Sequence, residues 1–209
     1  MLTESNDIKS EFAIVHQLLN SSSKSRGVDA FCLALLKVER QARRLFTYLS
    51  FQSDCFSCCD VGDMRKVLAK DRSFNFSSAL AGFDLLSPIS MESLVGQRYI
   101  GLMAELAKIQ AVSNKLFHGQ VTIDGLSREG LETFAGHLIE WATALSTSAQ
   151  LKLGYGGFTL TSSYTKHTDL HFRSTLKHKL TGIEDYCVLI KKAHAHGKDF
   201  LSVRNRHHS

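Results

Sequence analysis

Apolar residues recur along the chain at the spacing of helices. In six segments they return every three or four residues, so that each segment would carry one apolar face. These segments are residues 7–20, 29–49, 63–70, 90–117, 127–153 and 183–194. Ser90 and Ser127 stand at the start of two of them, where a serine oxygen can cap a helix N-terminus. The pattern therefore predicts helices over most of the chain.

Two stretches depart from this pattern. Residues 71–90 contain Gly82, Pro88 and several serines, and we expect an irregular segment that packs back on the body through its phenylalanines. A glycine-rich turn at 154–157 marks a boundary, and residues 158–164 beyond it have the composition of a strand.

The fold class is predicted to be all-α. Residues 1–153 are expected to form a bundle of four to five helices, and residues 154–209 a basic C-terminal extension or subdomain. A single proline and a hydrophobic content of 44% favour a helical chain over a turn-rich β fold.

The net charge of +5 is unevenly distributed. Residues 1–150 carry 15 Lys and Arg against 16 Asp and Glu, whereas residues 151–209 carry 10 against 4, together with seven of the ten histidines. A basic segment beside a neutral body is typical of proteins that bind polyanions, most simply nucleic acid. A solvated surface that only keeps the protein in solution explains the same charges equally well.

Neither a membrane span nor a secretory signal is visible in the sequence. No apolar run approaches the roughly 20 residues that cross a bilayer, and the N-terminus lacks a basic region followed by an apolar one. We therefore expect a cytoplasmic protein, in which the five cysteines are free thiols. Cys55, Cys58 and Cys59 could offer thiolates to zinc, but no second pair follows at zinc-finger spacing. No metal and no cofactor are expected.

Residues able to do chemistry gather at the end of the segment 90–117. It closes with Ser113, Asn114 and Lys115, and a histidine, His118, follows directly before a glycine. The pKa of histidine lies near neutrality, so that His118 could give or take a proton. On a continuous helix Asn114 shares a face with His118, and Lys115 adds a cation that could meet a phosphate. A histidine at a helix C-terminus also complements the helix dipole without any catalytic role.

Metal-free cleavage of RNA requires little more than these groups. A general acid or base must act on the ribose hydroxyl or the leaving oxygen, and a cation must stabilise the charged transition state. One histidine and one cation per subunit suffice if two subunits pool their residues across a two-fold axis.

This part of the sequence resembles the HEPN domain (higher eukaryotes and prokaryotes nucleotide-binding). The resemblance rests on the Asn-x-x-x-His step at 114–118, the glycine after it, the capped helix that follows, and the stretch 38–46. It covers residues 8–153. Many HEPN proteins are metal-independent endoribonucleases of toxin–antitoxin, phage-defence and RNA-processing systems. They act as homodimers whose motifs face one another.

The resemblance assigns a role to each motif position. His118 takes the place of the catalytic histidine, Asn114 that of the polar residue, and Ser113 that of the motif arginine. A serine cannot supply the guanidinium fork that binds a phosphate through two hydrogen bonds. The resemblance therefore implies an endoribonuclease fold whose catalytic arginine is replaced.

Three explanations for Ser113 stay open. The arginine was replaced to remove the toxicity of an active ribonuclease, or the chain is a naturally inactive member that still dimerises and binds RNA, or another cation takes its place. The candidate RNA-binding cations are Lys115, Arg40, Arg43 and Arg44. Expected partners are an RNA substrate, a second copy of the chain and an antitoxin protein of nucleotidyltransferase type. The alternative function is a non-catalytic dimeric RNA- or protein-binding module.

Overall fold

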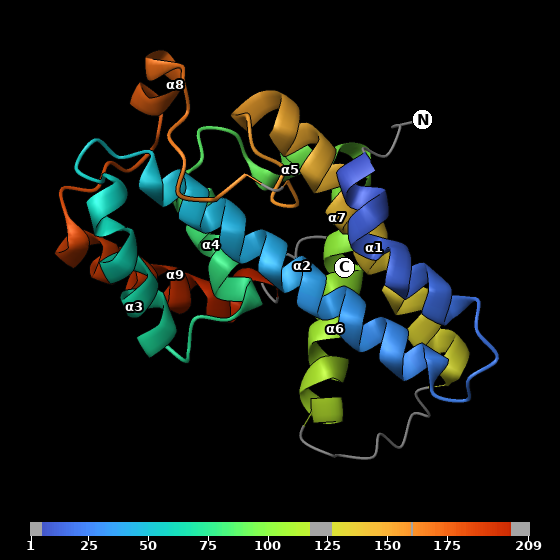
Figure 1. Cartoon of the computed structure of the whole chain (residues 1–209). Helices are drawn as coiled ribbons and strands as arrows, with labels where there is room; N and C mark the ends of the chain where they lie inside the picture. The colour runs from blue at the N-terminus through green and yellow to red at the C-terminus, as the bar shows by residue number, and fades with distance from the viewer. Residues whose placement is uncertain (1–5, 118–126, 160, 202–209) are drawn as a thin grey trace.

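The computed structural model describes residues 6–117, 127–159 and 161–201, and this part of the chain contains helices and no strand (Figure 1). The elements are α1 (Asn6–Leu19), α2 (Arg26–Phe51), the 3-10 turn η1 (Cys58–Asp60), α3 (Val61–Lys70), α4 (Phe76–Leu86), α5 (Met91–Val95), the 3-10 turn η2 (Gly96–Arg98), α6 (Tyr99–Phe117), α7 (Arg128–Leu153), α8 (Leu170–Ser174) and α9 (Ile183–Phe200). The predicted all-α class is confirmed. The strand-like interpretation of residues 158–164 is wrong for the residues described there, because none of them joins a strand ladder.

The segments 71–90 and 90–117 differ from the sequence-based expectation. Residues 71–90, expected to be irregular, contain α4, whose start is capped by the Asn75 side chain accepting from the backbone N–H of Ser78. The expected single helix over 90–117 is divided into α5, η2 and α6. Gly96 ends α5 with a φ of +79°, a conformation that glycine adopts without steric cost.

Helix α2 is the central element of the bundle. It packs against α7, α4 and α1, while α4 also packs closely against α9. Figure 1 shows α2 running through the molecule, with α1, α6 and α7 around its first half and α3, α4 and α9 around its second half. Its buried face includes Phe31, Leu35, Val38, Ala42, Leu45, Phe46 and Leu49, which the apolar spacing had marked.

The segment after α7 is held along α2 by side chains of that helix. The buried Gln41 amide donates to the carbonyl oxygen of Gly156 at 3.2 Å, and the hydroxyl of Tyr48 donates to that of Leu153 at 3.0 Å. The rings of Tyr48 and Tyr155 stack with centroids 4.6 Å apart. The backbone of this segment therefore satisfies its polar groups on α2 side chains instead of in a sheet.

Helix α9 belongs to the same hydrophobic core as the helices before it. Tyr186, Leu189 and Ile190 are buried in that core, and Gly197 lies against the backbone of Ser78 in α4. A Cβ atom at position 197 would come within 2.8 Å of the Ser78 Cα, so the glycine allows the two helices to approach closely. The division of the chain into a bundle over 1–153 and an extension or subdomain over 154–209 stays a prediction.

Candidate functional site

The end of α6 carries three of the expected motif residues. Ser113 is only 2% exposed, and its hydroxyl donates to the carbonyl oxygen of Gln110 at 3.0 Å. Asn114 is exposed, and its side-chain oxygen accepts a 3.3 Å hydrogen bond from the Gln110 amide. Lys115 is exposed as well. His118, the expected catalytic residue, lies outside the described residues.

Positions 113 and 114 therefore face different surroundings. The Ser113 side chain is directed into the bundle, whereas the Asn114 side chain meets solvent. An arginine at position 113 could reach a phosphate only if its long side chain extended from this buried site to the surface, as arginine side chains can. The burial of position 113 explains why a small residue fits there. An arginine at the same position would place a long charged side chain at a buried site.

Arg40 and Arg43, expected to bind RNA, both contact the protein itself. The Arg40 guanidinium lies 3.6 Å from the Glu11 carboxylate, at an exposed edge between α2 and α1. Arg43 donates to the Phe74 carbonyl oxygen at 2.5 Å, and its guanidinium lies 5.8 Å from the centre of the Phe74 ring. These contacts give Arg43 a structural role, whereas the side chain of Arg40 is 60% exposed and its role in RNA binding stays a prediction.

Arg44 is bound still more completely. It donates to the carbonyl oxygens of Thr159 and Thr161 at 2.8 and 2.7 Å, and its guanidinium lies over the Tyr155 ring at 5.5 Å. A phosphate would have to compete with these contacts. Arg44 thus holds the segment after α7 to the surface of α2.

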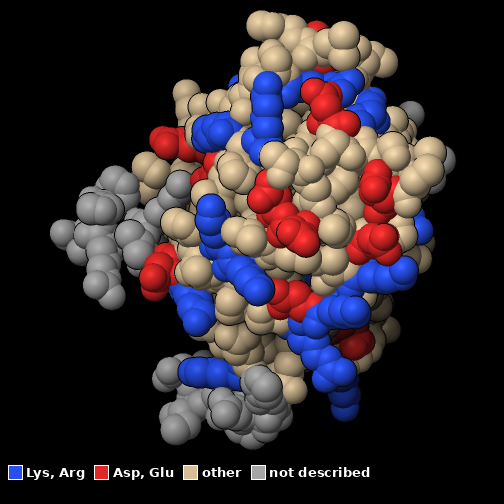
Figure 2. Space-filling model, turned by 90° about the vertical axis from the view of Figure 1, so that its left-hand side faces the viewer, with Lys and Arg blue, Asp and Glu red and all other residues tan. Residues whose placement is uncertain are grey.

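The expected RNA-binding cations stand on two helices that are not main neighbours of each other. Lys115 is on α6, whose main neighbours are α7, α5 and η2, whereas the arginines are on α2, whose main neighbours are α7, α4 and α1. Figure 2 shows the face that looks out from the α3 and α9 end of Figure 1, where blue basic and red acidic side chains alternate. The basic excess of the C-terminal region therefore does not produce a uniform positive field on this face.

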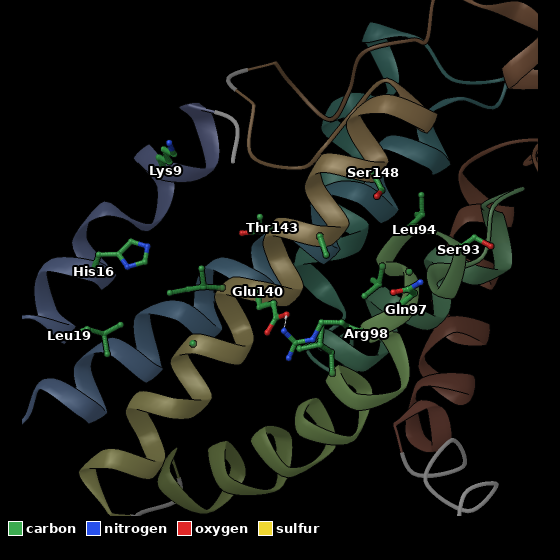
Figure 3. A pocket seen from close by; sticks show the side chains of 16 residues that line it. Lys9, His16, Leu19, Ser93, Leu94, Gln97, Arg98, Glu140, Thr143 and Ser148 are labelled. Carbon is green, nitrogen blue, oxygen red and sulfur yellow. Dashed lines mark ion pairs between the residues drawn. The ribbon is translucent and has the colours of Figure 1, made fainter. Parts of the chain in front are cut away.

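A groove that the sequence did not reveal lies between α1 and the α5–η2–α6 region, with α7 as its floor (Figure 3). We call it the α7 groove. It has a volume of about 990 Å³. Its apolar lining comes from Leu19, Leu94, Val95, Leu102, Ile139 and Ala144. A concave volume of this size, open to solvent and lined by several helices, falls in the range of ligand pockets.

The polar lining of the α7 groove contains three basic residues and one acidic residue, Glu140, together with Ser93, Gln97, Thr143 and Ser148. Lys9 and His16 project from α1. On the other side of the groove, Arg98 of η2 forms an ion pair with Glu140 of α7 (Figure 3). The side chains of Lys9 and His16 form no hydrogen bond or ion pair with any other residue in the described ranges. Only a fold that brings α1 beside α7 and η2 could reveal this groove, because its basic residues are far apart in the sequence.

Three of the five cysteines lie at the surface around η1. Cys55, Cys58 and Cys59 are exposed free thiols around η1, and burial is the main factor that raises the pKa of the Cys55 thiol. A raised pKa keeps a thiol protonated and lowers its reactivity as a nucleophile. Among the residues whose placement is described, no group of three or more His, Cys, Asp and Glu is arranged to hold a metal ion.

One half-buried cation, Lys166, has a structural explanation. Lys166 donates to the carbonyl oxygens of Phe51 and Ser53 at 2.5 Å each, where α2 ends. Burial, and next the nearby charge of Arg173, lower the pKa of the Lys166 ammonium. Carbonyl groups at a helix C-terminus attract cations, so Lys166 stabilises the end of α2.

Within the described part of the chain, none of the helices has both the length and the apolar character needed to cross a bilayer. Comparisons of the chain with family models, with curated proteins and with solved structures find no match.

Proposed function

We propose that the chain is a HEPN-type, metal-independent endoribonuclease of the toxin or phage-defence kind, in a form whose motif arginine is replaced by Ser113. The observation that carries the proposal is the end of α6, where Asn114 and Lys115 are exposed on the last turn, directly before His118. A long helix followed by a second long helix, α7, agrees with the helical context of the motif.

The proposed chemistry uses few groups. His118 acts as the general acid or base on the ribose hydroxyl or the leaving oxygen, and Asn114 orients the imidazole or the phosphate. A cation at position 113 would stabilise the charge of the transition state. The products are a 2′,3′-cyclic phosphate and a 5′-hydroxyl, formed in the cytoplasm without a metal.

Homodimer formation is part of the proposal, because one subunit supplies a single motif histidine, His118. The ring of Phe117 is 60% exposed at the end of α6, next to the motif. An apolar ring in this position is suited to being covered by a second subunit, and a pair of such contacts would bring two motifs together.

A non-catalytic dimeric module that binds RNA or protein is the second candidate. The burial of Ser113 and the protein contacts of Arg43 and Arg44 favour it, because they leave the motif without a free arginine. In this form His118 has a structural role, and Lys115 contributes one phosphate contact.

The deciding experiment restores the arginine. Ser113→Arg, with and without His118→Ala, is incubated with labelled RNA, with EDTA and with added Mg²⁺. Ser113→Gln is the matched control, because it is also long and polar but carries no charge. We expect cleavage by Ser113→Arg alone, insensitive to EDTA and lost with His118→Ala. If Ser113→Arg is folded by circular dichroism and leaves RNA intact, while the protein still binds RNA, the module is supported.

A further inference from the structure

We propose that the α7 groove binds a small anion with an apolar body, specifically a free alkyl carboxylate of fatty-acid type. The alkyl chain lies along α7, and the carboxylate is held by Lys9 and His16 of α1. This site is separate from the proposed nuclease motif. Arg98 and Asn114 stand near opposite ends of α6, and sixteen residues of helix span about 24 Å.

The shape and lining of the α7 groove suit an alkyl chain. Its floor is formed by α7, and apolar side chains from α1, α5, α6 and α7 line it. Gly136 widens the floor, since it lies in α7 among the lining residues and a Cβ placed there would meet no other atom within 4 Å. Apolar surface in such a groove gains free energy when a hydrocarbon displaces water from it.

The charges around the groove favour an anion. Glu140 is already paired with Arg98, so its negative charge is compensated. Lys9 and His16 have no such partner among the residues that the structure describes, and the His16 ring points from α1 toward α7 (Figure 3). A carboxylate placed beside α1 would meet at least one uncompensated positive charge, and two when His16 is protonated.

Calorimetric titration of the full chain with sodium decanoate, below its micelle concentration, tests the site. Gly136→Leu should fill the groove and weaken decanoate binding on the order of tenfold or more. Gly62→Leu is the matched control, because Gly62 is an exposed helical glycine of α3 whose added Cβ also meets no atom within 4 Å. It should leave the affinity unchanged. Thermal unfolding of each variant confirms that it is folded.

The anion preference is tested with 1-decanol and with the double variant Lys9→Gln/His16→Gln. Decanoate should bind more tightly than 1-decanol, and the double variant should weaken decanoate binding about fivefold while leaving 1-decanol binding unchanged. The proposal is overturned if decanoate does not bind, if Gly136→Leu binds it normally, or if 1-decanol binds as tightly as decanoate. Binding only to anionic phospholipid vesicles also overturns it. None of these measurements reads RNA cleavage, so they stand apart from the proposed nuclease.

Discussion

The backbone N–H of His167 donates a 2.7 Å hydrogen bond to Oε1 of Gln52. The same amide donates through Nε2 to the carbonyl oxygens of Thr165 at 3.0 Å and Tyr48 at 2.8 Å. Gln52 is buried, directly after the last residue of α2. A single side chain therefore satisfies three backbone groups and ties the segment after α7 to the end of α2.

Replacing Gln52 by leucine should destabilise the protein by about 2–3 kcal/mol. The substitution keeps the apolar bulk but leaves the His167 N–H and the Thr165 carbonyl without their partner. Urea unfolding measures the change. Gln17→Leu, at an exposed position of α1, serves as control and should change the stability by less than about 0.5 kcal/mol.

The same variant should loosen the segment after α7 locally. Limited proteolysis is expected to cut Gln52→Leu within residues 154–169 faster than it cuts the unmodified chain. Equal cleavage rates in the two proteins would show that Gln41 and Arg44 hold this segment without Gln52.

Glycine-to-alanine substitutions in α9 and α7 should change the stability of the protein in opposite directions. Gly197→Ala places a Cβ 2.8 Å from the backbone of Ser78, so it should destabilise the protein by about 1–2 kcal/mol despite the better helix propensity of alanine. Gly136→Ala meets no atom within 4 Å and should stabilise by about 0.5–1 kcal/mol. Thermal unfolding checks both changes. Stabilisation by both would show that α4 and α9 can separate at little cost.

The long amphipathic helices could be predicted from the sequence because their apolar spacing is regular and their caps are local. The cap at Ser127 is confirmed, with its hydroxyl accepting from the Gly130 N–H at 3.0 Å. Helix α4 was missed because serines and Gly82 lower its helix propensity, whereas its burial on every side stabilises it through tertiary contacts. Residues 158–164 have the composition of a strand, but the carbonyl oxygens of Thr159 and Thr161 accept from the Arg44 side chain of α2.

The candidate sites differ in how much the sequence could reveal. The motif at 113–118 is contiguous and was visible, but the burial of Ser113 follows from packing of α6 and could not be read from spacing. The roles of Arg43 and Arg44 depended on carbonyl oxygens about 30 and 115 residues away in the sequence. The α7 groove depends on the relative positions of α1, α5, α6 and α7, which no local pattern encodes.

Stability should fall between about pH 10 and pH 12, in part through Tyr48. Burial, and next the neighbouring Tyr155, raise the pKa of the Tyr48 hydroxyl to about 12. Above pH 10 the unfolded chain loses this proton while the folded chain retains it, so deprotonation favours unfolding. The contribution of Tyr48 to the free energy of unfolding is fully present below pH 10 and is lost as the pH rises toward 12.

Tyr48→Phe isolates that contribution. It removes the hydrogen bond to Leu153 and should cost about 1 kcal/mol at pH 8. Its loss of stability between pH 10 and pH 12 should be smaller than that of the unmodified chain by about 2 kcal/mol. Parallel pH profiles of the two proteins would contradict the assignment to Tyr48.

Restoring arginine at position 113 should also carry a structural cost. Ser113 is buried, so Ser113→Arg should lower the stability by about 1–3 kcal/mol through overpacking, whereas Asn114→Arg, one position along on the exposed face, should change it by less than about 0.5 kcal/mol. Urea unfolding of both variants measures this. Equal stability would mean that an arginine side chain at position 113 extends to the surface without strain, as a phosphate-binding arginine needs.

Substitutions of Lys115 and Arg44 should differ in effect: the first should change RNA affinity, and the second should change the stability of the fold. Lys115 is exposed, so Lys115→Ala should leave stability unchanged, weaken RNA binding and reduce the slope of affinity against salt by about one. Arg44→Ala should instead cost about 2 kcal/mol, because the Thr159 carbonyl loses its donor and the Thr161 carbonyl keeps only the longer bond from the Tyr155 hydroxyl, and should leave the RNA affinity of the folded protein unchanged. Arg72→Ala, which removes the same charge from an exposed site, controls for charge alone. Loss of RNA affinity in Arg44→Ala, with the fold intact, would show that RNA displaces the segment after α7 to reach this arginine.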